Sequence, residues 1–193
     1  MQPELWIIAG VNGAGKTTFT TCRKFKMPIV NPDVLPGAPV EQGIAAVKQR
    51  EALVKAQQSF AVETTATGNV FLKKVQDIKN QGFRINLVYI GLDSAKTSGL
   101  RVRSRVKSGG HNILKEDIKR RYPRSMANLP KLMEIADLSL VFDNSTSRAY
   151  SLVLHREKGH VEFIRKDLPQ WALKAIPENS FPEWGGCREP QDC

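Results

Sequence analysis

The sequence predicts an α/β fold in which a parallel sheet is flanked by helices, and three observations support this. Short apolar runs at residues 5–9, 59–62, 84–92 and 138–142 are typical of buried strands. Segments between them, such as residues 41–58, carry apolar residues at helical spacing. A glycine-rich loop follows the first strand directly. At 193 residues the chain is long enough for one well-buried core, and we expect a single domain.

The glycine-rich loop runs from Gly10 to Thr17 and fits the pattern G-x-x-x-x-G-K-S/T without a mismatch. Glycines allow backbone N–H groups to turn inward around an anion, and the N-terminus of a following helix adds positive partial charge. We therefore predict that the loop binds nucleotide phosphates, with Lys16 on the β- and γ-phosphates and the Thr17 hydroxyl on Mg²⁺. A chance glycine-rich turn is the alternative, and the flanking strand and helix argue against it. The predicted ATP-binding residues are Gly10, Asn12, Gly13, Ala14, Gly15, Lys16, Thr17 and Thr18.

Further elements follow from the same patterns. A short strand within residues 28–33 ends in a proline turn, and Asn69 is expected to cap the helix that follows it. Residues 150–155 and 160–165 alternate in polarity, which predicts a hairpin at the edge of the sheet. The predicted helices cover residues 17–24, 41–58, 70–81 and 168–176. Another helix is expected to begin at residues 116–121, and Asp93 and Ser94 are expected to cap a further one.

Two carboxylates are expected at the edge of the sheet where the phosphate loop opens, because ligands bind at the carboxyl ends of parallel strands. Asp33 is a candidate general base for a substrate hydroxyl, or an outer-shell partner of Mg²⁺. Its alternative role is that of an aspartate in a proline-rich turn. Glu63, Thr64 and Thr65 follow a strand and suit the orientation of a hydroxylated substrate or a metal-bound water. These three residues could instead simply begin the next helix.

The charge of the chain is concentrated in one segment. The net charge is +10, and residues 96–131 hold eleven Lys and Arg against Glu116 and Asp117, so this segment carries +9. An overall basic surface would favour nucleic acid, whereas a basic segment facing a phosphate loop favours a polyphosphate substrate. We predict that residues 96–131 form an arginine-bearing helical lid. The alternative is a solvated basic helix face.

Several side chains of this segment are candidate site residues. Arg101 and Arg105 lie four residues apart and share one face of a helix. Guanidinium groups in such a lid suit a transferring phosphoryl group, because their fork matches its oxygens and their charge is not titrated away. His111, after a double glycine, is a candidate substrate contact, although a structural histidine is an equal alternative.

The composition further restricts the location, cysteine chemistry and partners that we expect for this protein. The sequence has neither an apolar run of membrane-spanning length nor a signal region, so we expect a cytoplasmic protein without a membrane partner. Cys22, Cys187 and Cys193 lack metal-ligand spacing, and bystander thiols are favoured over a bridge between the last two. Three tyrosines and three tryptophans argue against binding of long single-stranded nucleic acid. Residues 1–176 are expected to form the domain and residues 177–193 a tail.

Over residues 5–145 the chain resembles the zeta toxin family, the P-loop kinases of toxin–antitoxin systems and their chromosomal relatives. The resemblance rests on the ordered combination of several short blocks and not on the phosphate loop alone. Val11 and Leu114 stand where the family often has proline. The matching stretches are residues 8–19, 31–33, 60–65, 101–106, 109–111 and 117–125.

The resemblance implies a P-loop kinase fold with a parallel five-stranded core and transfer of the ATP γ-phosphate to a sugar hydroxyl, in characterised members that of UDP-N-acetylglucosamine. It implies that Lys16 and Thr17 hold ATP and Mg²⁺, that Asp33 matches the proposed base and that Glu63 matches a substrate-binding carboxylate. It also implies that two arginines clamp the transferring phosphoryl group, and the candidates for this pair are Arg105, Arg120 and Arg121. An antitoxin protein is an implied partner. Two alternatives stay open: a kinase acting on a nucleoside, nucleotide or polynucleotide end, and a nucleotide-dependent protein whose output is a partner contact.

Overall fold

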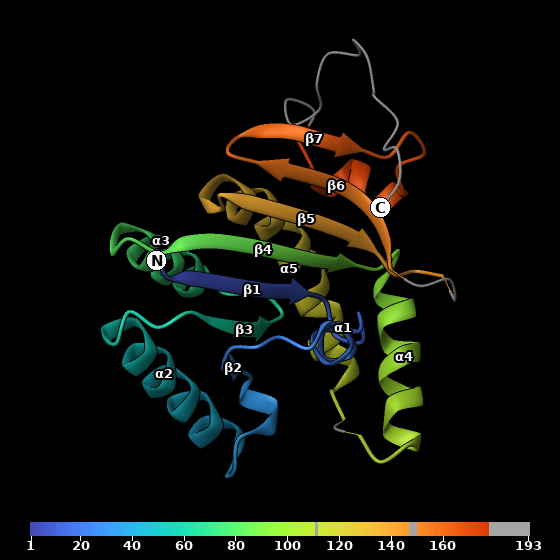
Figure 1. Ribbon diagram of the computed structural model, residues 1–193. Helices are drawn as coiled ribbons and strands as arrows, with labels where there is room; N and C mark the ends of the chain where they lie inside the picture. Colours follow the sequence, from blue (N-terminus) through green and yellow to red (C-terminus); the bar gives the residue numbers. More distant parts are fainter. Residues whose placement is uncertain (111, 147–149, 178–193) are drawn as a thin grey trace.

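A seven-stranded sheet forms the centre of the computed structural model, which describes residues 1–110, 112–146 and 150–177 (Figure 1). The strand order is β2-β3-β1-β4-β5-β6-β7. The first five strands in this order are parallel, as predicted, and the predicted hairpin adds two antiparallel strands to the same sheet. The strands are β1 (Glu4–Gly10), β2 (Ile29–Val30), β3 (Phe60–Thr64), β4 (Arg84–Gly91), β5 (Leu138–Asp143), β6 (Ser151–Glu157) and β7 (His160–Ile164).

Helices cover both faces of the sheet unequally. One face packs against α2, α3, α5 and α6 and forms the larger core, which includes Phe60, Leu87 and Leu132. The other face packs against α1, whose Phe19 lies in a smaller core with Val88. The helices are α1 (Lys16–Arg23), α2 (Pro39–Lys55), α3 (Asn69–Asn80), α4 (Ala95–Lys107), α5 (Lys115–Ile135) and α6 (Gln170–Ala175), with a short 3₁₀ helix at Pro32–Val34.

Helix α5 begins at Lys115, beside the predicted start at Glu116, and extends well beyond the stretch 116–121 that predicted it. The helix continues to Ile135 through both Pro123 and Pro130. Each proline removes one backbone hydrogen bond. The helix nevertheless continues because its second half is buried in the larger core, where Leu129 and Leu132 are fully buried. Tertiary packing therefore outweighs the local signal.

Two smaller predictions about helix ends are settled by the backbone. Asn69, predicted as the residue that caps α3, is the first residue of the helix, and Gly68 occupies the capping position. Ser94 does cap α4, because its side chain accepts a hydrogen bond from the Thr97 backbone N–H. No helix in the described part of the chain is long and apolar enough to span a membrane.

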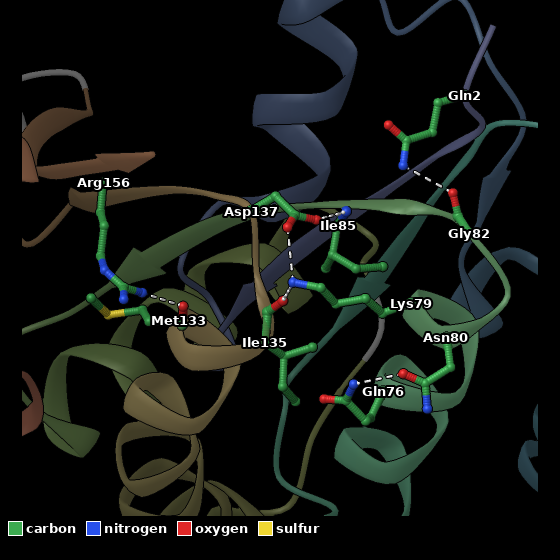
Figure 2. Close-up of polar contacts among 10 residues, drawn as sticks. All are labelled: Gln2, Gln76, Lys79, Asn80, Gly82, Ile85, Met133, Ile135, Asp137 and Arg156. Atoms are coloured by element: carbon green, nitrogen blue, oxygen red, sulfur yellow. Dashed lines mark hydrogen bonds and ion pairs between the residues drawn. The ribbon is translucent and has the colours of Figure 1, made fainter. Parts of the chain in front are cut away.

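Asp137 joins three elements at the amino ends of the strands (Figure 2). Its carboxylate accepts a hydrogen bond from Lys79 Nζ at 2.8 Å and another from the Ile85 backbone N–H at 2.8 Å. Lys79 also donates to the Ile135 carbonyl at the end of α5. These bonds fix α3 and α5 against β4 and β5, and they lie at the opposite end of the strands from the phosphate loop.

Candidate active site

The phosphate loop connects the end of β1 at Gly10 to the start of α1 at Lys16, as predicted. Gly10, Gly13 and Gly15 have φ angles of 144°, 72° and 96°, a region that side chains rarely adopt. A Cβ atom at Gly10 would lie 2.2 Å from the Ile90 carbonyl oxygen. Both conformation and close packing thus require glycine here, which is the reason the loop pattern was informative.

Three side chains from outside the loop donate hydrogen bonds to its outward carbonyl groups. Ser98 Oγ of α4 donates to Asn12 O at 2.6 Å. After β5, Asn144 Nδ2 donates to Ala14 O at 2.8 Å and Tyr150 OH donates to Gly15 O at 2.8 Å. In a trans peptide the N–H points opposite to the carbonyl, so these three bonds turn the N–H groups of the following residues away from the anchors. This is the arrangement that an anion-binding loop needs.

Lys16 lies over the loop in the structure. Its ammonium donates to the carbonyls of Gly10 at 2.9 Å and Val11 at 3.1 Å. The pKa of Lys16 is lowered from 10.5 to about 8, mainly because the ammonium is buried; the nearby Glu63 and Asp33 oppose this lowering and Arg105 adds to it. Lys16, Arg105 and two carboxylates therefore share one electrostatic environment, and all four are among the residues predicted for the site.

Glu63 is the most connected carboxylate in the site. It is 9% exposed at the carboxyl end of β3, and its Oε2 accepts hydrogen bonds from Thr17 Oγ1 at 2.8 Å and Asn31 Nδ2 at 2.9 Å. Its Oε1 lies 2.7 Å from Thr20 Oγ1 of α1. Both carboxylate oxygens thus accept hydrogen bonds within the protein, and two of the donors, Thr17 and Thr20, belong to α1. This position suits a partner of the metal site at least as well as the predicted substrate contact.

Asp33 lies just after β2, in the 3₁₀ helix Pro32–Val34, at the edge of the sheet where the phosphate loop opens. Its side chain is exposed, and its backbone N–H donates to Asn31 Oδ1 at 3.0 Å. An exposed carboxylate near Lys16 fits a base that meets an incoming hydroxyl. Its location also fits the alternative of an aspartate in a proline-rich turn, because it is in fact in one.

The arginines of α4 and α5 differ in their surroundings. Arg105 lies close enough to Lys16 to lower its pKa, and the Cγ of Arg105 is 2.5 Å from where a Cβ of Gly110 would be. The glycine therefore makes room for this side chain. Arg101 donates to the Thr146 carbonyl at 3.2 Å, across the connection that follows β5.

Arg120 and Arg121 pair with Asp117, one turn earlier on α5. The hydrogen bond from Arg120 holds the pKa of the Asp117 carboxyl below its usual range. In this structure both guanidinium groups are thus engaged near the start of α5. Their predicted contact with a phosphoryl group, and the assignment of residues 96–131 as a lid, remain predictions.

The remaining predicted substrate contacts lie in or after β3. Thr64 Oγ1 accepts a hydrogen bond from the Ala66 backbone N–H at 3.0 Å. Thr65 Oγ1 and Thr67 Oγ1 are 3.4 Å apart. These hydroxyls stabilise the turn after β3, which does not begin the next helix directly. His111 lies outside the described residues, as do Cys187 and Cys193 in the predicted tail.

The residues present fit Mg²⁺ and a triphosphate. The Thr17 hydroxyl donates its hydrogen bond to Glu63, so the lone pairs of its oxygen are left for a cation, and hard oxygen donors are what Mg²⁺ prefers. The glycine loop and Lys16 supply donors for phosphate oxygens. No cluster of three or more His, Cys, Asp or Glu side chains that could hold a metal occurs among the described residues.

Sequence reasoning missed five residues that build this site. The loop anchors are distant in sequence and belong to residue types that are common in loops, so no pattern marked them. Asn31 stood beside Asp33 in the matching block without a role of its own. The missed residues are Thr20, Asn31, Ser98, Asn144 and Tyr150.

The sheet order and the anchored glycine loop define the P-loop kinase fold, and solved structures agree. A chain of the AvrRxo1-ORF1:-ORF2 complex superposes with a TM-score of 0.73 at 16% identity over 92% of this chain. The same complex with ATP gives 0.68 at 16% identity over 83% of this chain. Our chain spans 65% and 60% of the lengths of those two chains. The PezAT chromosomal toxin–antitoxin system of Streptococcus pneumoniae gives a TM-score of 0.57 at 20% identity, covering 80% of this chain and 72% of that one.

One curated relative shows the family. A Haemophilus influenzae protein described as uncharacterized is 30% identical over 132 residues, covering 63% of this chain and 94% of the relative. The chain therefore belongs to the family of that protein. No family model matches the sequence.

Proposed function

We propose that the protein is an ATP-dependent kinase that transfers the γ-phosphate to a hydroxyl of a small molecule, with a UDP-sugar such as UDP-N-acetylglucosamine as the first candidate. The observation that carries the proposal is that Lys16 shares one environment with Arg105 and with the carboxylates Asp33 and Glu63. A phosphate-binding loop, a cation for the transferring group and a carboxylate for the acceptor are the parts that phosphoryl transfer needs.

The nucleotide side of the site follows from the loop. The N–H groups that Ser98, Asn144 and Tyr150 turn inward would hold the phosphates, together with Lys16. Thr17 would hold Mg²⁺, and when bound this ion neutralises charge on the β- and γ-phosphates. Because Glu63 fixes the direction of the Thr17 hydroxyl, the site is oriented before the nucleotide arrives.

On the acceptor side, Asp33 would accept the proton of the attacking hydroxyl as the oxygen–phosphorus bond forms and the bond to ADP breaks. Arg105 would stabilise the charge on the transferring group, because it is a fixed cation beside Lys16. Arg120 and Arg121 would join it if the start of α5 moved toward the loop and released Asp117. The choice of a UDP-sugar is supported by the resemblance of residues 60–65 and 109–111 to zeta toxins.

An antitoxin partner is a related proposal. It is supported by the resemblance to zeta toxins and by the similarity in fold to a chain of the PezAT system. Expression of the protein alone tests it: growth arrest that Lys16→Ala abolishes supports a toxin, and normal growth argues against a potent one without affecting the kinase proposal.

The experiment that tests the kinase is acceptor-dependent ADP formation from ATP and Mg²⁺, measured with UDP-N-acetylglucosamine beside a panel of nucleosides, nucleotides, sugars and short oligonucleotides. Transfer to the UDP-sugar that is lost in Lys16→Ala and Asp33→Ala supports the whole proposal. Transfer only to another acceptor keeps the kinase and changes the substrate. If no acceptor stimulates ADP formation, the result favours the alternative of a nucleotide-dependent protein that binds a partner.

A further inference from the structure

Asn31 connects the two halves of the candidate active site. Its Nδ2 donates to Glu63 Oε2 at 2.9 Å, and its Oδ1 accepts from the Asp33 backbone N–H at 3.0 Å. The side chain is 8% exposed. Since Glu63 also accepts from Thr17, a short chain of hydrogen bonds leads from the predicted metal-binding hydroxyl to the backbone N–H of the predicted base.

The segment that carries Asp33 has little other support from the sheet. Strand β2 has only two residues and pairs with β3 alone, through Ile29 with Ala61 and Val30 with Val62. After Val30 the chain leaves the sheet and turns into the 3₁₀ helix Pro32–Val34. The Asn31 amide therefore ties the backbone of Asp33 to a side chain of β3 just beyond the point where strand pairing ends.

An amide is the group that this position requires. Asn31 must donate to a carboxylate on one side and accept from a backbone N–H on the other, and a planar amide does both at once. An aspartate would keep the acceptor but would place two carboxylates together, which disfavours the charged state of both. A serine could still accept from the Asp33 N–H, as in other helix caps, but it is too short to replace the donor toward Glu63.

We propose that Asn31 is a positioning residue, which holds Asp33 in register with the phosphate loop through Glu63. The inference rests on the proposed function, because it assigns Asp33 the role of base. It has a specific consequence: the effect of changing Asn31 should pass through Asp33, and nucleotide binding should be largely preserved because Thr17 keeps its bond to Glu63.

A double-mutant cycle tests this with the acceptor that the wild type uses. Asn31→Ala is expected to lower kcat about tenfold, since small misplacements of a reacting group can cost up to about 100-fold, while the Kd for a non-hydrolysable ATP analogue changes less than about threefold. In an Asp33→Asn background, Asn31→Ala should add no further loss of kcat. The proposal would be overturned if the kcat losses of the two single variants multiplied in the double variant, or if Asn31→Ala kept the kcat of the wild type.

A measurement without turnover separates this inference from the proposed function. Amide hydrogen exchange at Asp33 in the nucleotide-free protein should accelerate in Asn31→Ala and stay slow in Asn31→Ser, which keeps the acceptor. Unchanged exchange in Asn31→Ala would overturn the proposal even if no acceptor were found. Gln42→Ala is the matched control, because Gln42 Nε2 donates to the Leu35 carbonyl at 2.7 Å, at the far end of the same turn. It should leave kcat and the Asp33 exchange rate unchanged, and thermal unfolding of each variant checks that it is folded.

Discussion

The Thr17 hydroxyl donates a hydrogen bond to the Glu63 carboxylate across 2.8 Å, joining α1 to the end of β3. Because the O–H of Thr17 points at the carboxylate, the lone pairs of the Thr17 oxygen are directed elsewhere. This relationship links a residue of the phosphate loop to one that sequence patterns place among substrate contacts, and it makes the metal site the first place to test.

Glu63→Gln should reduce the gain in ATP affinity that Mg²⁺ provides, because the hydroxyl of Thr17 loses its charged partner. Residues that orient a metal ligand typically affect metal affinity about 10- to 100-fold. Titration calorimetry of ATP with and without Mg²⁺ measures the gain, and Thr17→Val should show the same loss. Thr21→Ala removes an exposed hydroxyl from the same helix and serves as control. If Mg²⁺ increased the ATP affinity of Glu63→Gln as much as that of the wild type, Glu63 would not orient the metal-binding hydroxyl.

Lys16→Met should abolish most phosphoryl transfer, by a factor on the order of 10²–10³, as for other groups that stabilise transition-state charge. The fold should be retained. Burial disfavours the charged ammonium in the folded state, so the variant is expected to unfold at the wild-type temperature or above it. Kinetics and thermal unfolding measure both effects, with the exposed Lys26→Met as control. Unfolding of Lys16→Met at a clearly lower temperature would show that Lys16 supports the fold.

The affinity for ATP should depend on pH through Lys16. Phosphate favours the protonated lysine, so the pKa of Lys16 in the complex must lie above the value of about 8 in the free protein. Affinity is then constant below the free pKa and weakens as pH rises through it, by up to about tenfold per pH unit. Fluorescence titrations without Mg²⁺ between about pH 7 and 9.5 measure this. Lys16→Met should show a flat profile over this range, and an equally flat wild-type profile would exclude the lowered pKa.

Tyr150→Phe should weaken ATP binding about fivefold, because one hydrogen bond worth about 1 kcal/mol no longer orients the Gly15 carbonyl. Tyr89→Phe is the matched control: Tyr89 OH lies 2.9 Å from Ser125 Oγ in the core, away from the loop. The control should lower stability and leave ATP affinity unchanged. Equal ATP affinities in wild type and Tyr150→Phe would mean that the loop keeps its shape without this anchor.

Asp137→Ala should destabilise the fold by about 2 kcal/mol, because it leaves the Ile85 N–H and the Lys79 ammonium without their acceptor (Figure 2). ATP affinity should be unchanged, since these bonds lie at the opposite ends of the strands. Urea unfolding measures the loss. Gln76→Ala, which removes an exposed side-chain bond to Asn80 on α3, should change stability little. If Gln76→Ala lost as much unfolding free energy as Asp137→Ala, the effect would come from a general weakening of α3 and not from the bonds of Asp137.

Sequence patterns predicted the parts of this protein that depend on short stretches of chain. The phosphate loop, five parallel strands and the hairpin β6–β7 were predicted because glycine geometry and apolar periodicity are local properties. The path of α5 could not be predicted, since its continuation through Pro123 depends on core contacts made by residues such as Leu132. Local proline chemistry and distant packing oppose each other there, and packing decides.

In the candidate site, too, some residues could be predicted from local sequence and others depend on distant contacts. Lys16, Asp33, Glu63 and Arg105 were predicted because each follows a strand or lies in a charged segment. The residues that hold the loop in place could not be predicted. Asn144, for example, bonds a residue 130 positions earlier in the chain and lies in no distinguishing sequence pattern. A role that consists of holding another residue's backbone becomes visible only in three dimensions.

The measurement that tests the central claim most directly is identification of the product after a single turnover of MgATP with the acceptor that stimulates ADP formation. Mass spectrometry should find the acceptor carrying one phosphoryl group, in an amount equal to the ADP formed, with none from Lys16→Met or Asp33→Asn. ADP matched by free phosphate, with the acceptor unmodified, would contradict the account and make the protein a nucleotide hydrolase.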